Sequence, residues 1–91
     1  MKVIICGGGR VGYAIASYLS RENNHVVIID EKEAVIRKVS ETIEAVAVQG
    51  NAAHPDILRA AGIENADMIV AVTGSDEVNM MACQVAAALS T

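Results

Sequence analysis

The chain has 91 residues, which is one domain at most, and 7 basic against 11 acidic side chains leave a net charge of −4. Aromatic residues make up only 2%, while 12 Val and 10 Ile outnumber 3 Leu, a balance that favours strands buried on both faces. Single-stranded nucleic acid is bound in basic grooves with aromatic stacking platforms. Because this chain is acidic and has almost no aromatic side chains, we expect it to have no nucleic-acid partner.

Membrane insertion and disulfide bonding are also excluded by the sequence. No uncharged apolar run approaches the roughly 18 residues of a membrane span, and the apolar run at residues 3–6 is too short for a signal peptide. Two cysteines, Cys6 and Cys83, do not form a disulfide framework, so we expect two buried apolar thiols in the reducing cytoplasm. His25 and His54 have no Cys or His neighbours at metal-ligand spacing, so no metal site is predicted.

The first half of the chain predicts two strands and two helices. Residues 3–6 form an apolar run that ends in three glycines, and apolar side chains at helical spacing then predict a helix over residues 10–21. A second strand is predicted over residues 26–29, closed by Asp30. The helix after it has an apolar face made of Val35, Ile36, Val39 and Ile43.

The second half repeats this alternation. A third strand is predicted over residues 45–49, and a short helix begins near Pro55, capped by Asn51 or His54, and stops at Gly62 in a left-handed conformation. The fourth strand covers residues 68–72. Acidic residues then suit the positive end of a last helix, whose apolar stripe runs from Val78 to Leu89.

Strands that alternate with helices predict an α/β fold, a Rossmann-like doubly wound parallel sheet with right-handed crossovers. The dinucleotide-binding pattern gives the strand order 3-2-1-4. Complete folds of this type carry further strands, and the fourth strand would otherwise be an exposed apolar edge. We therefore expect residues 1–91 to be a fragment of a longer chain, truncated to about four βα units, or to associate with a second copy.

Residues 7–12 carry the strongest motif, G-x-G-x-x-G, with glycines at Gly7, Gly9 and Gly12. Gly7 permits a tight turn, Gly9 lets the backbone approach a pyrophosphate, and Gly12 lets the helix pack closely on the sheet. The free N–H groups of that helix then face negative charge. The motif follows a strand, opens a helix and precedes Asp30 by 18 residues, which is the context that a dinucleotide site requires. The alternative is a tight turn without a ligand.

Asp30 is predicted to accept the ribose hydroxyls of an adenosine and to repel a 2′-phosphate, which favours NAD over NADP. Its alternative role is the N-cap of the second helix. Arg10 is a candidate for bidentate phosphate binding, or else a solvated side chain. Gly50 and Asn51 suit the floor and the adenine edge of a pocket, although turn chemistry alone also explains them.

Thr73 and Gly74 end the fourth strand, beside the point where the strand order reverses and where such sheets bind ligands. The first turn of the last helix carries Asp76, Glu77 and Asn79. These residues could contact a ligand or cap the helix, and the sequence supports the two roles equally. No Tyr-x-x-x-Lys pair or other general base for hydride transfer is present. We therefore predict no catalytic residues and a sensor rather than an enzyme.

Beyond these motifs, the chain resembles the nucleotide-binding domains of the RCK (KTN) family over almost its whole length. The resemblance is carried by the sequence at residues 4–12, 27–30, 50–51, 58–67 and 72–79. It implies a regulatory domain of a cytoplasmic potassium-transport subunit, with NAD(H) or ATP/ADP as the effector. It also implies a membrane potassium transporter as partner, through the full-length protein, a homo-oligomer, and a location at the inner face of the plasma membrane.

By the same resemblance, phosphates are expected at the glycine loop, ribose at Asp30, and the rest of the ligand at the ends of the third and fourth strands. The implied site residues are Gly7, Gly9, Arg10, Val11, Gly12, Asp30, Gly50, Asn51, Thr73 and Gly74. The family's usual residue at position 51 is Asp, and here Asn51 keeps an oxygen but loses the charge. Two alternatives remain, namely the cofactor-binding portion of an NAD-dependent dehydrogenase and a fragment that serves only in assembly.

Overall fold

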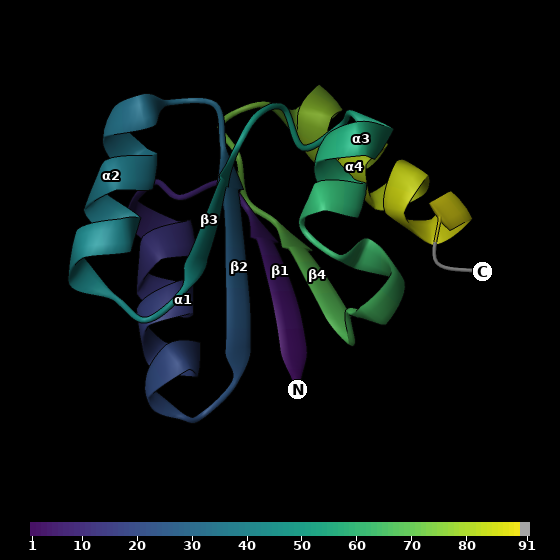
Figure 1. Ribbon diagram of the computed structural model, residues 1–91. Helices are drawn as coiled ribbons and strands as arrows, with labels where there is room; N and C mark the ends of the chain where they lie inside the picture. Colours follow the sequence, from purple (N-terminus) through teal and green to yellow (C-terminus); the bar gives the residue numbers. More distant parts are fainter. Residues whose placement is uncertain (90–91) are drawn as a thin grey trace.

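The computed structural model describes residues 1–89, which form one parallel sheet with helices on both faces (Figure 1). The strand order is β3-β2-β1-β4, as predicted. The strands are β1 (Lys2–Cys6), β2 (His25–Asp30), β3 (Val46–Gln49) and β4 (Met68–Ala71). All three pairings are parallel, so every strand ends at the same edge of the sheet.

The helices form two layers that follow from the alternation of side chains along the strands. On one face α1 (Arg10–Arg21) and α2 (Glu33–Thr42) pack through Ala16 and Val39 against the odd-numbered residues of β1. On the other face α3 (Pro55–Ala60), the short 3₁₀ turn η1 (Ile63–Asn65) and α4 (Asp76–Leu89) pack against Ile4 and Cys6. Residues 3–6 of β1 are fully buried because both faces of the central strand are covered.

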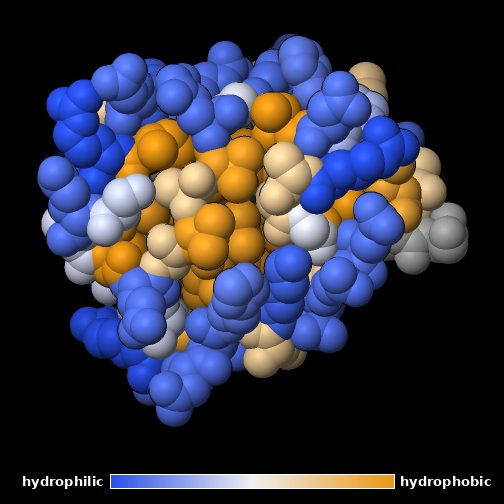
Figure 2. Space-filling model, viewed as in Figure 1, coloured by the Kyte–Doolittle hydropathy of each residue, from blue (hydrophilic) through white to orange (hydrophobic). Residues whose placement is uncertain are grey.

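Two layers on a sheet this small give a thin core. Leu58 of α3 is fully buried, and α4 contributes mainly Ala82 and Ala86. Figure 2 shows apolar side chains gathered over the strands in the middle of the molecule, with hydrophilic side chains around them. At the two sheet edges, Val46 of β3 is 50% exposed and Met68 of β4 is 46% exposed.

The structure differs from the sequence predictions mainly at α3 and α4. Gly62 adopts a left-handed conformation (φ 85°), as predicted, but the 3₁₀ turn that follows was not foreseen. The prediction that both cysteines are buried is wrong for Cys83, which is exposed, and Met80 is 68% exposed. The reason is that α4 meets the sheet through Ala82 and Ala86, with Val85 and Leu89 partly buried beside them, so Met80, Met81 and Cys83 stay outside.

The α1 and α2 helices are also joined to one another. The Tyr13 hydroxyl lies 2.6 Å from the Thr42 hydroxyl, and the Lys38 ammonium lies 4.5 Å from the centre of the Tyr13 ring. Within the described residues 1–89, no helix has both the length and the hydropathy needed to cross a bilayer.

Candidate functional site

A hollow of about 410 Å³ lies at the edge of the sheet where the strands end, and we call it the carboxyl-edge hollow. Six of the ten predicted site residues line it: Gly7, Gly9, Asp30, Gly50, Thr73 and Gly74. The other four, Arg10, Val11, Gly12 and Asn51, do not line it. The topology thus brings together loops from β1, β2, β3 and β4 that are far apart in the sequence, at the point where sheets of this type bind ligands.

Three glycines of residues 7–12, two in the loop after β1 and one in the first turn of α1, are required by the packing of the protein itself. Gly7 has a left-handed φ of 106°, and a Cβ there would lie 2.8 Å from the carbonyl oxygen of Val72. A Cβ on Gly8 would lie 2.6 Å from Val35, and one on Gly12 would collide with the carbonyl oxygen of Gly7. Glycine at these positions lets the β4–α4 loop, α2 and α1 each approach the loop after β1 closely.

Gly9 is different, because the protein gives no steric reason for a glycine there. A Cβ on Gly9 would have no atom within 4 Å, and its φ of −71° suits any residue. Gly9 is the N-cap of α1 and makes no side-chain cap. Within residues 1–89, the N–H groups of Arg10, Val11 and Gly12 have no acceptor. The helix therefore begins with unpaired donors and open space beside them, an arrangement that suits an anion.

Asp30 connects the end of β2 to the glycine loop. One carboxylate oxygen accepts the N–H of Gly8 at 2.9 Å, and the other accepts the N–H of Lys32 at 2.9 Å. The N-cap of α2 is Lys32, so Asp30 is not the cap itself but fixes the turn that precedes the helix. Each carboxylate oxygen has a further lone pair, which leaves the half-buried Asp30 able to accept two hydroxyl groups.

Gly50 and Asn51 take up the turn after β3. The N–H of Gly50 donates to the carbonyl of Asp30 at 2.9 Å, and a Cβ on Gly50 would collide with Ile57. The side-chain oxygen of Asn51 accepts the N–H of Ala53 at 2.8 Å. Asn51 therefore acts in this structure through the turn, which brings Ala52 to the wall of the carboxyl-edge hollow.

The β4–α4 loop (residues 72–75) forms the opposite wall. The Thr73 N–H donates to the side-chain oxygen of Asn79 at 2.9 Å, and the Thr73 hydroxyl lies 2.6 Å from the same oxygen. The Ser75 hydroxyl accepts the N–H of Val78 at 3.2 Å and so caps α4. Of the acidic residues at the start of α4, Glu77 accepts the Ser75 hydroxyl at 3.1 Å.

Sequence reasoning missed the apolar walls and one cation of the hollow. These additional lining residues are Ile29, Glu31, Lys32, Val35, Ala52, Val72, Ser75 and Val78. Six of these eight residues, all except Val35 and Val78, lie within two residues of a predicted site residue. Their closeness to a strand end is the sequence feature that could have identified them. Away from the hollow, burial raises the pKa of the Cys6 thiol to about 12, and Cys83 adds to the rise.

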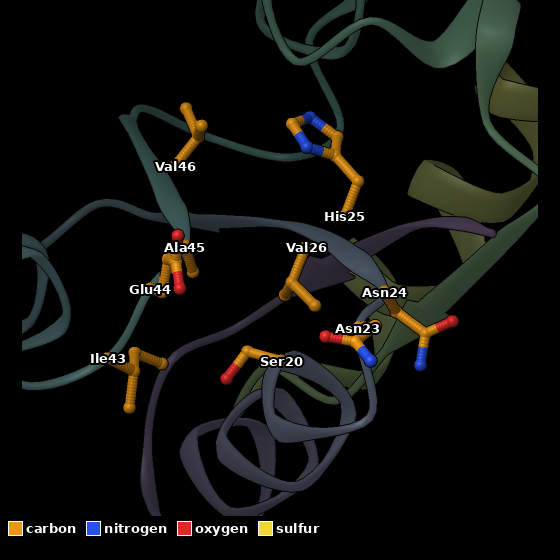
Figure 3. Close-up of a pocket in the computed structure, with 9 residues that line it drawn as sticks. All are labelled: Ser20, Asn23, Asn24, His25, Val26, Ile43, Glu44, Ala45 and Val46. Carbon is orange, nitrogen blue, oxygen red and sulfur yellow. The ribbon is translucent and has the colours of Figure 1, made fainter.

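A larger hollow of about 570 Å³ lies at the opposite edge of the sheet, and we call it the amino-edge hollow (Figure 3). In the close-up, Val26 lies between residues 43–46 and the end of α1, which contributes Ser20. This hollow faces the carboxyl ends of α1 and α2, where the helix dipole is negative, and it carries Glu44. An anionic ligand is therefore disfavoured there, and we assign the candidate site to the smaller, carboxyl-edge hollow.

Solved structures share this architecture. The chain superposes on the Kef CTD of Shewanella denitrificans, determined in an AMP-bound form, with a TM-score of 0.82 and 27% identity over 97% of this chain and 52% of that chain. It also superposes on ChuY, an anaerobillin reductase from Escherichia coli O157:H7, with a TM-score of 0.77. At 17% identity, over 99% of this chain and 47% of that one, the second likeness shows the fold alone.

Sequence relatives are more similar. The chain is 51% identical to the Trk system potassium uptake protein TrkA of Azorhizobium caulinodans over 93% of its length, and 48% identical to TrkA of Vibrio alginolyticus over 94%. It spans only 19% of either relative. The family profile of the TrkA-N domain matches residues 3–91. With this match over almost its whole length, the chain belongs to the TrkA-N domain family.

Proposed function

We propose that this chain binds an adenine nucleotide, NAD(H) or ATP/ADP, in the carboxyl-edge hollow and acts as the nucleotide-responsive regulatory part of a potassium-uptake protein. The observation that carries the proposal is the start of α1. Its N–H donors lack acceptors within residues 1–89, and the glycine beside them, Gly9, has no neighbour that requires a glycine. A bound phosphate explains both features.

The remaining parts of the hollow suit the rest of such a ligand. Asp30 is already oriented by two N–H donors and offers lone pairs to the ribose hydroxyls. Aliphatic side chains of Val35 and Ala52 give the adenine an apolar surface. Arg10 is exposed at the first turn of α1, where its guanidinium is free to follow the phosphates. Gly50 and Asn51 shape the floor, and Thr73 and Gly74 close the site from the β4 side.

The transport role rests on the named relatives. They are potassium uptake proteins, and this chain spans about a fifth of their length, so we propose that residues 1–91 belong to a longer protein. In that setting the partner is a membrane potassium transporter subunit, the assembly is a homo-oligomer, and the location is cytoplasmic, at the inner face of the membrane. The nucleotide acts without catalysis, through different affinities for two states of the assembly.

The alternative is the cofactor-binding portion of an NAD-dependent dehydrogenase. The reductase with a similar structure shares the fold at 17% identity, which carries no functional argument. The relatives from Azorhizobium caulinodans and Vibrio alginolyticus, at 51% and 48% identity, are both named as Trk system potassium uptake proteins, and this favours regulation of transport.

Calorimetric titration of the chain with AMP, ADP, ATP, NADH and NADPH tests the proposal. We expect binding of at least one adenine nucleotide and weaker binding of NADPH than of NADH, because Asp30 repels a 2′-phosphate. Absence of binding by all five would overturn the nucleotide-effector role. Equal affinity for NADH and NADPH would contradict the role of Asp30.

Gly9→Ala gives a more specific test, because the added methyl group would contact a bound ligand but no atom of the protein within 4 Å. We expect the free energy of unfolding to change by about 1 kcal/mol or less, the difference between Gly and Ala at an N-cap. The affinity should fall about tenfold or more, because the methyl group occupies the space next to the phosphate. A matched control is Ala14→Gly, an exposed position on the same helix away from the hollow, which should lower stability by about 1 kcal/mol and leave affinity unchanged.

A further inference from the structure

The β4–α4 loop is closed on itself by a single side chain from the helix that follows. Asn79 lies on α4, six residues after Thr73, and is half-buried. Its side-chain oxygen accepts the Thr73 N–H at 2.9 Å, and its side-chain nitrogen donates to the Thr73 carbonyl at 3.2 Å. Both backbone polar groups of Thr73 are therefore paired with one amide.

The chemistry of this contact selects asparagine. The amide supplies an acceptor and a donor side by side, matching the donor and acceptor of one residue's backbone, and this fixes which of its two end atoms is the oxygen. Aspartate has no donor for the Thr73 carbonyl. Alanine leaves both Thr73 groups without a partner. The arrangement pairs the backbone of Thr73, which lies two residues beyond the end of β4.

The Thr73 hydroxyl is also used inside the loop. It donates to the Asn79 oxygen at 2.6 Å, with the Ser75 carbonyl at 3.1 Å as a second acceptor, and it accepts the Ser75 N–H at 3.2 Å. Its one proton is thus engaged within the loop. Gly74 lies between these two fixed residues, and it is exposed and lines the hollow. Its N–H has no acceptor within residues 1–89.

We propose that Asn79 is a positioning residue for the nucleotide, holding the β4–α4 loop so that the Gly74 N–H points to the ligand. In this arrangement Thr73 acts through the shape of the loop and not as a hydrogen-bond donor to the ligand. The inference rests on the proposed function, because it assigns a supporting residue to the same site. Asn79 holds the loop in this way even when no ligand is bound.

The test compares Asn79→Ala with Gln84→Ala, which removes an amide from an exposed position of the same helix. The first readout needs no ligand and is the hydrogen exchange of the Thr73 N–H. We expect its exchange to quicken about tenfold or more in Asn79→Ala, because the N–H loses its acceptor, and to stay unchanged in Gln84→Ala. Unchanged exchange in Asn79→Ala would overturn the loop-holding role.

The second readout is the affinity for AMP and NADH, measured calorimetrically. Asn79→Ala should bind about tenfold more weakly, and Gln84→Ala should bind like the parent. The variant Asn79→Asp should show a pH-dependent affinity that a purely structural role of residue 79 would not produce. Its binding should recover as the pH is lowered, after correction for the parent at each pH, since a protonated carboxyl regains a donor for the Thr73 carbonyl.

The outcomes separate the two proposals. If the parent binds neither AMP nor NADH, the proposed function fails and the ligand role of Asn79 fails with it, while the exchange of Thr73 still decides whether Asn79 holds the loop. If the parent binds and Asn79→Ala binds equally well, the inference is wrong and the proposed function stands. Should Asn79→Ala prove unfolded, Thr73→Val tests the same loop by replacing the hydroxyl with a methyl group. The Ser75 N–H, which donates to that hydroxyl, should then exchange faster as binding weakens, and Thr73→Ser should restore both.

Discussion

The carboxylate of Asp30 accepts the N–H of Gly8 at 2.9 Å, so the end of β2 holds the glycine loop that follows β1. The two segments are 22 residues apart in the sequence, and Asp30 faces the loop while its other oxygen accepts the Lys32 N–H. One side chain thereby sets the position of the glycine loop and of the turn leading into α2. The role in shape and the proposed role in ribose binding are compatible, because they use different lone pairs.

Replacement of Asp30 should affect both roles. Asp30→Ala leaves two N–H groups without their acceptor, and we expect the free energy of unfolding to fall by about 1–2 kcal/mol. Affinity for NADH should fall about tenfold or more while NADPH loses less, so that the preference for NADH narrows. Urea unfolding measures the change in stability, and calorimetry measures the two affinities. If the ratio of NADH to NADPH affinity is the same in Asp30→Ala as in the parent, Asp30 does not contact the ribose.

Gly12→Ala should destabilise the fold without acting on the ligand directly. The added Cβ would collide with the carbonyl oxygen of Gly7, a backbone atom that moves only with the loop. We expect a loss of about 3 kcal/mol, at the upper end of the usual cost of overpacking. Chemical unfolding measures this loss of stability, and Gly9→Ala is the comparison because its added methyl group enters open space. Equal stability of the two variants would contradict the packing argument.

Asn51 is expected to act through the turn after β3. Asn51→Ala removes the acceptor of the Ala53 N–H and should lower stability by about 1 kcal/mol. Asn51→Asp keeps that acceptor, so its stability should match that of the parent. Thermal unfolding of the two variants measures the difference. If Asn51→Asp instead changes nucleotide affinity strongly at unchanged stability, position 51 contacts the ligand directly.

The two cysteines should differ widely in reactivity. Cys83 is exposed, whereas Cys6 is fully buried and its thiol pKa is raised to about 12 by burial, with a further contribution from Cys83. At pH 8 a disulfide reagent such as Ellman's should label one thiol rapidly and the second only as the protein opens. Cys83→Ser should remove the fast phase and leave the slow one. Two fast phases would show that Cys6 is accessible.

The raised pKa of Cys6 also predicts the direction of alkaline destabilisation. The folded protein holds the thiol proton more tightly than the unfolded chain, whose value is near 9.0. This contribution is therefore complete below pH 9 and is lost as the pH rises through 12. Cys6→Ala should flatten the fall in unfolding midpoint between pH 9 and pH 11, measured by circular dichroism.

The fold could be predicted closely because its signals are local. Apolar runs closed by Gly or Asp define β1 and β2, and helical spacing gives α1 as Arg10–Arg21, the same bounds that the structure has. What the sequence could not reveal was how deeply α4 packs. Its stripe from Val78 to Leu89 predicts one buried face, but tertiary packing decides how deeply each side chain lies. Ala82 and Ala86 of the stripe are buried, Val85 and Leu89 only partly, and Met81 is exposed.

Residues that line the carboxyl-edge hollow could be predicted where a backbone position strongly restricts the residue type. Gly7 and Asp30 are of this kind, since a tight turn and a strand end restrict what fits. The wall formed by Val35 and Val78 could not be found, because an aliphatic residue near the start of a helix looks the same whether it lines a hollow or a core. The proposed positioning role of Asn79 depends on a contact with Thr73 that only the folded loop creates.

The absence of rings from the carboxyl-edge hollow has a practical consequence. Its walls are aliphatic and polar, the chain has no Trp or Phe, and both tyrosines belong to α1 without lining the hollow. The near-ultraviolet signal of the protein therefore comes from these two tyrosines, both away from the hollow. A reduced nicotinamide absorbs at longer wavelengths than tyrosine, so its induced circular dichroism or its fluorescence should report occupancy directly, without a label.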